Sequence, residues 1–277
     1  MSLRLKFVLL ALTLSLLVYW GCDVNRQNEY QEQLVLQGQM IVGYPPTVRL
    51  THTVPIGEAS EEYDVGVAGA DVRMRIGTDS NSVDYRMTEY SSRGWPGYYT
   101  LNNGHRVTPG VHYAITVAVR GDTLRAETVA AGRMFLLYQN EDTVVCGSPT
   151  ALVLRWRPDS LASGYYVLVD NMEFNYEDNP VDCNINPFAT SSASNWSVSH
   201  RDDSLQVPWV MLRYRGRHEA IIFSCDRALW DYSYTAYYGQ TENYPVSNVQ
   251  GGLGLFSAVG VDTAYFYLTD QTTLGGQ

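Results

Sequence analysis

The chain has 277 residues, with 29 acidic and 19 basic side chains and a formal net charge of −10. This acidic balance argues against a nucleic-acid-binding protein, because a phosphate backbone requires a basic protein face. The length exceeds that of one average domain and favours two.

The N-terminus has the pattern of a secretory signal. Arg4 and Lys6 precede an uncharged apolar run over residues 7–20. As a helix this run would rise about 21 Å, which is short of a hydrocarbon core about 30 Å thick. We therefore expect residues 1–21 to be a cleaved signal peptide and not a permanent membrane span.

The cysteine at the end of this run indicates how the mature chain is anchored. Gly21 directly precedes Cys22, as in a bacterial lipoprotein signal, although Tyr19 and Trp20 stand where such signals usually carry leucine and a small residue. We predict covalent lipid, with palmitate-type acyl chains, on Cys22 and a polar tether over residues 22–32. The alternatives are a secreted protein whose cysteine is unmodified and a short anchor helix.

The predicted cleavage changes the composition of the mature chain. It leaves 29 acidic and 17 basic residues, all of them arginine, and a net charge of −12. This composition also argues against docking to anionic lipid through a polybasic patch. Three further cysteines, Cys146, Cys183 and Cys225, show no zinc-ligand spacing, so we expect one disulfide with the three pairings left open.

Residues 33–135 consist of short runs of alternating apolar and polar residues separated by turns, a pattern typical of β-strands. In VAGADVRMRI, for example, Val72 and Met74 share one face. The run TPGVHYAITVAVRGDTLRAETV predicts a hairpin that turns at Arg120-Gly121. We predict a β-sandwich whose motif spacing is similar to prealbumin-like and immunoglobulin-like sandwiches.

Residues 140–270 predict a second β domain. ALVLRWRPDSLASGYYVLVDN places Trp156 on an apolar strand that precedes a second strand. This order is similar to a fibronectin type III domain, in which a core tryptophan packs beneath the following strand.

One stretch of the second domain has helical spacing. We predict a short helix over residues 226–238, with Ser224 or Asp226 as its N-cap and Gly239 at its end. The predicted fold class is therefore mostly β, with two β-sandwich domains and one short helix.

Several motifs together resemble one known family. The lipoprotein signal is followed by LVLQGQMIVGYPPTVRLTHTVP, VAGADVRMRI, GYYTL and PGVHYAITVAVRGDTLRAET, and SNVQGGLGLF occupies residues 247–256. This set is similar to the Bacteroidota outer-membrane lipoproteins known as domain of unknown function forty-two forty-nine. The resemblance covers nearly the whole mature chain except residues 172–203. It implies a neighbouring TonB-dependent transporter and an accessory role in nutrient uptake, and it implies no catalytic residues.

The sequence contains few motifs typical of catalysis or of cofactor binding. The chain has neither a Gly-x-Ser-x-Gly elbow nor a His-Glu-x-x-His helix, and the lysine-free mature chain excludes a P-loop. We interpret the late GGLG as a tight turn with close backbone packing. The five histidines stand singly, and we expect His218 to be solvated on an edge strand. No enzymatic activity is therefore expected, and no cofactor apart from the lipid on Cys22.

The segment DNMEFNYEDNPVD, residues 170–182, is an acidic cluster. Its carboxylate oxygens suit calcium, but the spacing is not that of an EF-hand loop. We expect a metal-free, solvated acidic loop. The alternative is a calcium site formed by Asp170, Glu173, Glu177 and Asp178.

Aromatic residues are abundant, with 21 tyrosines and 6 tryptophans. Adjacent rings on a strand point to opposite faces of the sheet, so some of them must be exposed, where a ring can stack on a sugar or contact a peptide. The candidate ligand-binding residues are Trp196, Trp230, Tyr234, Tyr237 and Tyr238. The alternative for each ring is ordinary core packing.

Together these features predict a non-enzymatic outer-membrane lipoprotein that serves a TonB-dependent transporter as a ligand- or partner-binding accessory. We leave open whether it faces the periplasm or the cell surface. Two alternatives come from other classes: an adhesive or structural surface lipoprotein, and a surface hydrolase. The aromatic content supports binding, and a concave aromatic patch with a few polar groups is the expected form of the site.

Overall fold

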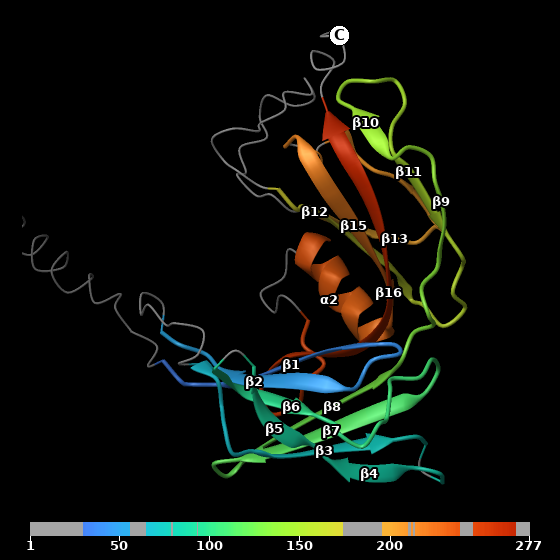
Figure 1. The fold of residues 1–277 in the computed structure, drawn as a ribbon. Coiled ribbons are helices and arrows are strands. Elements are labelled where there is room, and N and C mark those ends of the chain that lie inside the picture. Colours follow the sequence, from blue (N-terminus) through green and yellow to red (C-terminus); the bar gives the residue numbers. More distant parts are fainter. Residues whose placement is uncertain are drawn as a thin grey trace, which may run out of the picture. The chain divides into compact units, whose positions relative to one another are not determined.

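The computed structural model describes residues 30–55, 65–78, 80–92, 94–173, 196–209, 212, 214–238 and 246–269. This part of the chain is mostly β-strand, with helix α2 (Arg227–Tyr238) packed against it (Figure 1). The predicted mostly β fold class and the predicted helix are both confirmed. Among the described residues, no helix combines the length and the apolar character needed to cross a membrane.

The strands form three sheets. The nine-stranded sheet runs in the order β13 (Trp196–His200), β12 (Gly164–Asn171), β15 (Gly216–Cys225), β16 (Leu253–Thr269), β1 (Leu34–Ile41), β2 (Thr47–His52), β6 (Trp95–Thr100) and β5 (Thr88–Ser92), with β10 (Thr143–Val145) also paired to β16. The four-stranded sheet has the order β4 (Val83–Arg86), β3 (Asp71–Ile76), β7 (His112–Val119) and β8 (Asp122–Val129). The three-stranded sheet has the order β14 (Ser204–Gln206), β11 (Val153–Trp156) and β9 (Leu136–Gln139).

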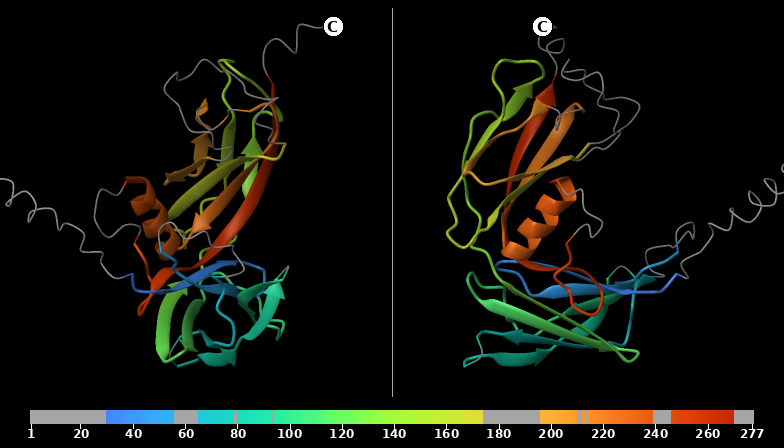
Figure 2. Two further views of the ribbon diagram at one scale, coloured as in Figure 1. Left: turned by 90° about the vertical axis from the view of Figure 1, so that its left-hand side faces the viewer. Right: turned by 180° about the vertical axis from the view of Figure 1, so that it is seen from behind.

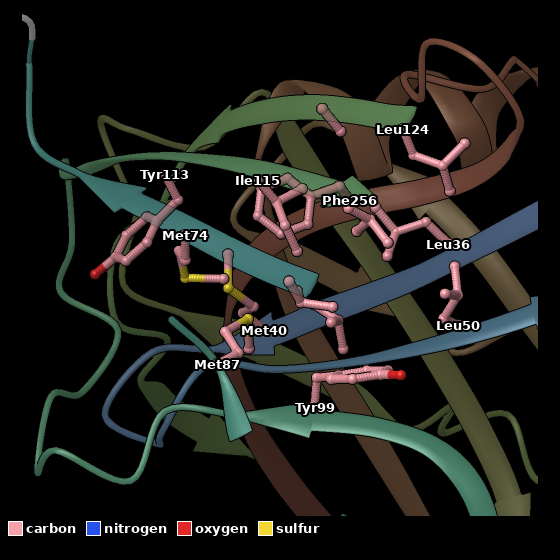
Figure 3. Packing of buried hydrophobic residues seen from close by; sticks show 14 of the residues in the cluster. Leu36, Met40, Leu50, Met74, Met87, Tyr99, Tyr113, Ile115, Leu124 and Phe256 are labelled. Carbon is pink, nitrogen blue, oxygen red and sulfur yellow. The ribbon is translucent and has the colours of Figure 1, made fainter. Parts of the chain in front are cut away.

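The first sandwich lies between the four-stranded sheet and the β1, β2, β6 part of the large sheet. The alternating residues of these strands point inward and form one buried cluster, of which Figure 3 shows a part. Leu36, Leu50 and Tyr99 come from one layer, and Met74 and Ile115 come from the other. Burial of this apolar surface, at about 25 cal/mol per Å², is the main force that holds the two layers together.

The second sandwich packs the three-stranded sheet onto β12, β15 and β16. Trp156 is 1% exposed, and its ring lies 5.1 Å from that of Tyr165 on the next strand of the chain. The predicted core position of Trp156 beneath the following strand is therefore confirmed. The hairpin predicted in the first sandwich is also present, because β7 and β8 turn at Arg120 and Gly121, which have φ angles of 53° and 94°.

Strand β16 belongs to both sandwiches. Its first half pairs in parallel with β1, from Leu253 to Val259, and its second half pairs antiparallel with β15, from Gly260 to Leu268. Figure 2 shows this strand running beside β1 and then beside β15. The proposed domains at residues 33–135 and 140–270 stay a prediction, but the last strand of the second range completes the core of the first.

Glycines at the start of β16 and just before it explain why this pairing is so close. Gly254 has a φ of 126°, and a Cβ atom there would lie 1.9 Å from the carbonyl oxygen of Leu36 on β1. A Cβ atom at Gly251 would lie 2.3 Å from the carbonyl oxygen of Thr123 on β8. The motif of residues 247–256 is thus a turn with close backbone packing, as the sequence predicts.

Helix α2 lies against β16, β12, β13 and β15 (Figure 2). Its N-cap is Asp226, whose Oδ1 accepts a hydrogen bond of 2.8 Å from the backbone N–H of Leu229. Of the two predicted caps, Asp226 is therefore the one used. The end predicted at Gly239 lies outside the described residues.

Two of the cysteines have defined states in the described part of the chain. Cys146 is disulfide-bonded to a partner outside the described residues. Cys225 is a free thiol that is fully buried beside α2.

Candidate binding groove

A groove of about 910 Å³ lies on the surface between the end of β1 and the second half of β16. We call it the Phe135 groove. Three chain segments and one arginine line it: the end of β1 with its turn, the connection from β8 to β9, and the outer side of β16. The lining residues are Ile41, Val42, Gly43, Tyr44, Arg106, Arg133, Met134, Phe135, Val261, Asp262, Thr263 and Tyr265.

The turn after β1 presents Tyr44, which is 63% exposed. Backbone hydrogen bonds hold this turn against the loop before β7, since the N–H of Gly43 donates to Val107 O at 2.8 Å and the N–H of Val107 donates to Tyr44 O at 2.9 Å. Arg106 adds a hydrogen bond of 3.1 Å from Nη1 to Gly43 O. The tyrosine is therefore displayed from a turn that is fixed at both ends.

The connection from β8 to β9 is pressed against β16. The N–H of Ala131 donates to Ala258 O at 2.9 Å, and the N–H of Gly132 donates to the carboxylate of Asp159 at 2.6 Å. A Cβ atom on Gly260 would lie 2.0 Å from the carbonyl oxygen of Gly132, so the two backbones meet without side chains between them. Beyond this contact the side chains of the connection alternate: Met134 is buried, whereas Arg133 and Phe135 are exposed.

Aromatic rings and guanidinium groups are paired along the groove. Arg157 lies over the ring of Phe135, 4.9 Å from its centroid, and Arg217 lies over the ring of Tyr265 at 5.4 Å. Such pairs hold exposed rings in place and are worth about 0.5–1 kcal/mol each at exposed sites. The rings are therefore oriented before any ligand arrives.

The charge inside the groove is positive, although the whole chain is acidic. Arg106 and Arg133 both line it. The one acid that lines it in the described part of the chain, Asp262, accepts hydrogen bonds from the backbone N–H groups of Leu136 at 2.7 Å and Thr263 at 2.8 Å. Asp262 therefore directs its oxygens to the backbone. On the neighbouring strand β15, Glu219 lies directly opposite Tyr265 in the pairing of the two strands.

A second groove of about 550 Å³ lies on the outer face of the four-stranded sheet. It is lined by Arg73, Arg75, Asp84, Ala114, Ile115, Thr116, Arg125, Ala126, Glu127, Asn248 and Gln250. Its charges largely pair with one another or with neighbours: Arg73 with Asp71 at 2.9 Å, and Arg75 with Asp84 at 3.0 Å. The groove has no aromatic lining residue, so we rank it below the Phe135 groove.

Of the aromatic residues singled out from sequence, the two whose side chains are described, Trp230 and Tyr234, do not line the Phe135 groove. Trp230 is only 6% exposed, and Arg201 covers its ring at 5.2 Å, whereas Tyr234 is 46% exposed and stacks on Trp230 at 5.8 Å. The ligand-binding role proposed for these two rings stays a prediction. Trp196 lies on β13, and residues 237–238 end α2, but their side chains are outside the described set.

Part of the predicted calcium loop falls within the described residues. Asp170 is the second-last residue of β12. Glu173 Oε2 accepts a hydrogen bond of 3.1 Å from the backbone N–H of Arg217. Glu177 and Asp178 lie outside the described residues, as does the lipidation site Cys22. No group of three metal-binding side chains occurs in the described parts of the chain.

The expectation that His218 is solvated is wrong. Strand β15 lies between β12 and β16 and is not an edge, and His218 is 1% exposed. Its Nδ1 lies 3.0 Å from Gly216 O, its Nε2 lies 3.3 Å from Asn171 Nδ2, and its ring stacks on Phe266 at 5.1 Å. Burial lowers the pKa of His218, against the opposing effect of the Gly216 carbonyl and of the charges on Asp170 and Glu173. The imidazole is therefore a neutral part of the core.

Comparison with known proteins adds little. No family model matches the chain, and no curated protein matches it either. Among solved structures, the chain is similar to titin Ig tandem domains, with 8% sequence identity over 87% of this chain and 99% of that one, at a TM-score of 0.20. A superposition this loose carries no functional argument, so the groove must be interpreted from its own residues.

Proposed function

We propose that this chain is a non-enzymatic, lipid-anchored protein of the outer membrane that binds a ligand or partner as an accessory to a TonB-dependent transporter. The lipoprotein signal that ends at Cys22 and the family resemblance of the sequence support the location and the transporter. The observation that carries the binding role is the Phe135 groove, in which oriented aromatic rings and two arginines line one concave surface.

The groove has the composition expected of a recognition site. Ligand sites generally combine apolar and aromatic walls with a few polar groups that fix orientation, in volumes of about 300–1,000 Å³. At about 910 Å³, with Tyr44, Phe135 and Tyr265 on its walls, the groove fits this description. Binding through ring faces requires no catalytic group, which is why we propose an accessory and not a hydrolase.

A crosslinked affinity purification tests the proposal. The tagged, lipidated protein is purified from native outer membranes, and the bound proteins are identified by mass spectrometry. We expect a TonB-dependent transporter to be recovered and to be lost with Cys22→Ala, which removes the acceptor of the lipid. Recovery of the protein alone from correctly fractionated membranes would refute the accessory role and favour an adhesive or structural lipoprotein.

A further inference from the structure

We infer that the Phe135 groove binds acidic saccharides, whose sugar rings stack on its aromatic side chains and whose carboxylates bind its arginines. The inference rests on the proposed function, because it names the class of ligand that the accessory protein would bind. It depends on three observations: the placement of the rings, the unbalanced positive charge and the hydrogen-bonded backbone.

The first observation concerns the rings. Tyr44, Phe135 and Tyr265 are 63%, 38% and 50% exposed, although rings of this size are usually covered in a folded protein. They come from three separate parts of the chain and line one groove. Rings held apart in this way offer several flat apolar faces, which match the flat C–H faces of successive sugar rings.

The second observation concerns charge. Among the described residues, Arg133 has neither a hydrogen-bond partner nor an ion-pair partner, and Arg106 uses one guanidinium nitrogen on Gly43 O. Their remaining donors face a groove in which Asp262 is the one acid among the described lining residues, and backbone N–H groups engage that acid. Arginine presents a planar fork of donors that matches a carboxylate, so an anionic ligand compensates this charge best.

The third observation separates saccharides from peptides. An extended peptide usually binds by adding a strand to a sheet edge with free backbone groups. Around this groove the backbone is already paired: Val42 N–H with Val259 O at 2.8 Å, Gly43 N–H with Val107 O at 2.8 Å, and Arg157 N–H with Phe135 O at 2.9 Å. Recognition must therefore come from side chains, and rings with guanidinium groups suit a chain of acidic sugars.

Isothermal titration calorimetry of the lipidated, full-length protein in detergent tests the inference. The probes are oligomers of galacturonate, of guluronate and mannuronate, and of a glucuronate-containing saccharide, each compared with its fully methyl-esterified form. Esterification keeps the rings and removes the charge. We expect at least one acidic oligomer to bind, and its ester to bind about tenfold more weakly or not at all because the arginine–carboxylate pairs are lost.

Matched variants locate the site. Arg133→Gln and Tyr265→Ala should each weaken binding by about tenfold, since aromatic and arginine side chains that a ligand covers dominate recognition. Tyr267→Ala is the control for the ring, because Tyr267 is 47% exposed on the same face of β16 but does not line the groove. Arg125→Gln is the control for charge, because Arg125 lines the second groove. Both controls should bind like the wild type, and circular dichroism checks that all four variants fold.

The outcomes separate this inference from the proposed function. Polyglutamate, titrated in the same way, serves as the acidic peptide probe. Equal binding of acid and ester, binding unchanged in Arg133→Gln and Tyr265→Ala, or binding of polyglutamate but of no saccharide would each overturn the inference. Recovery of a transporter without any saccharide binding would leave the accessory role standing and refute the ligand class. Saccharide binding at the groove without a transporter would support the ligand class and refute the accessory role.

Discussion

The carboxylate of Asp226 accepts a hydrogen bond of 2.5 Å from the hydroxyl of Thr128, which lies 98 residues earlier in the chain. The same oxygen, Oδ2, accepts a second hydrogen bond of 2.6 Å from the backbone N–H of Ala258, and Oδ1 caps α2 through Leu229. One buried side chain therefore joins β8, β16 and α2. Burial raises the pKa of Asp226, and the three hydrogen bonds oppose this shift.

Removal of this carboxylate should destabilise the fold strongly. Asp226→Ala removes the helix cap and leaves the buried N–H of Ala258 without its acceptor, so we expect a loss of about 2–4 kcal/mol in the free energy of unfolding. Urea denaturation measures it. Asp231→Ala is the matched control, because Asp231 lies on the same helix and makes an exposed i,i+4 pair with Arg227. It should cost less than about 1 kcal/mol, and an equal loss in both variants would contradict our account of Asp226.

Substitution of Gly254 should disrupt the pairing of β1 with β16. Gly254→Ala combines a positive φ with a Cβ atom 1.9 Å from Leu36 O, so the backbones must separate. Gly104→Ala is the control, because Gly104 also has a positive φ, of 81°, but no atom lies within 4 Å of the added Cβ. The control should cost about 1–2 kcal/mol, the usual penalty of a left-handed residue. Thermal unfolding should show a clearly larger loss for Gly254→Ala, and similar losses would refute the close approach.

The contribution of His218 to the free energy of unfolding should fall on mild acidification. Burial lowers its folded-state pKa below the ordinary value of 6.5, so the unfolded chain binds more protons once the pH drops through 6.5. The native state then loses about 1.4 kcal/mol for each unit by which the pKa is lowered, until the pH reaches the folded-state pKa.

Urea denaturation at pH 7.5, 6.5 and 5.5 measures this dependence. Because Asp226 has a raised pKa, it acts in the opposite sense, so the wild type must be compared with His218→Gln, which cannot take up the proton. The difference in stability between the two proteins should shrink as the pH falls. A difference that stays constant would show that His218 does not titrate in this way.

The thiol of Cys225 should not react in the native protein. It is fully buried, and its pKa is raised by burial and by the neighbouring charge of Asp226, so little thiolate forms. A thiol reagent followed by peptide mass spectrometry should label Cys225 only after denaturation. Labelling at the same rate in native and denatured protein would contradict the burial of this residue.

Local patterns in the sequence were sufficient to predict several elements. The hairpin at Arg120, the helix over residues 226–238 and the core position of Trp156 all follow from residues close together in the chain. The prediction for His218 was wrong because the order of strands in a sheet is not a local property. The ten residues of β15 would show the same alternation of apolar and polar side chains in an edge strand and in a central strand. The central position of β15 comes from its pairing with β12 and β16.

The groove was beyond sequence analysis for the same reason. Tyr44, Arg106, Phe135 and Tyr265 are spread over more than two hundred residues, and only the fold brings them together. Their local signals were weak: Tyr44 precedes two prolines in a turn, and Phe135 lies in a short connection three residues after Gly132. The aromatic residues of α2 stand close together in the sequence, but Trp230 is packed against Gly164 and under Arg201.

The position of β16 at the end of the described chain also has a consequence for biosynthesis. Phe256 and Ala258 belong to the core of the first sandwich, although that sandwich begins at Leu34. The first sandwich can therefore close only after β16 has been synthesised, and contacts this distant in sequence form slowly. Until then, the inward-facing side chains of β1 and of the four-stranded sheet lack part of the core that covers them.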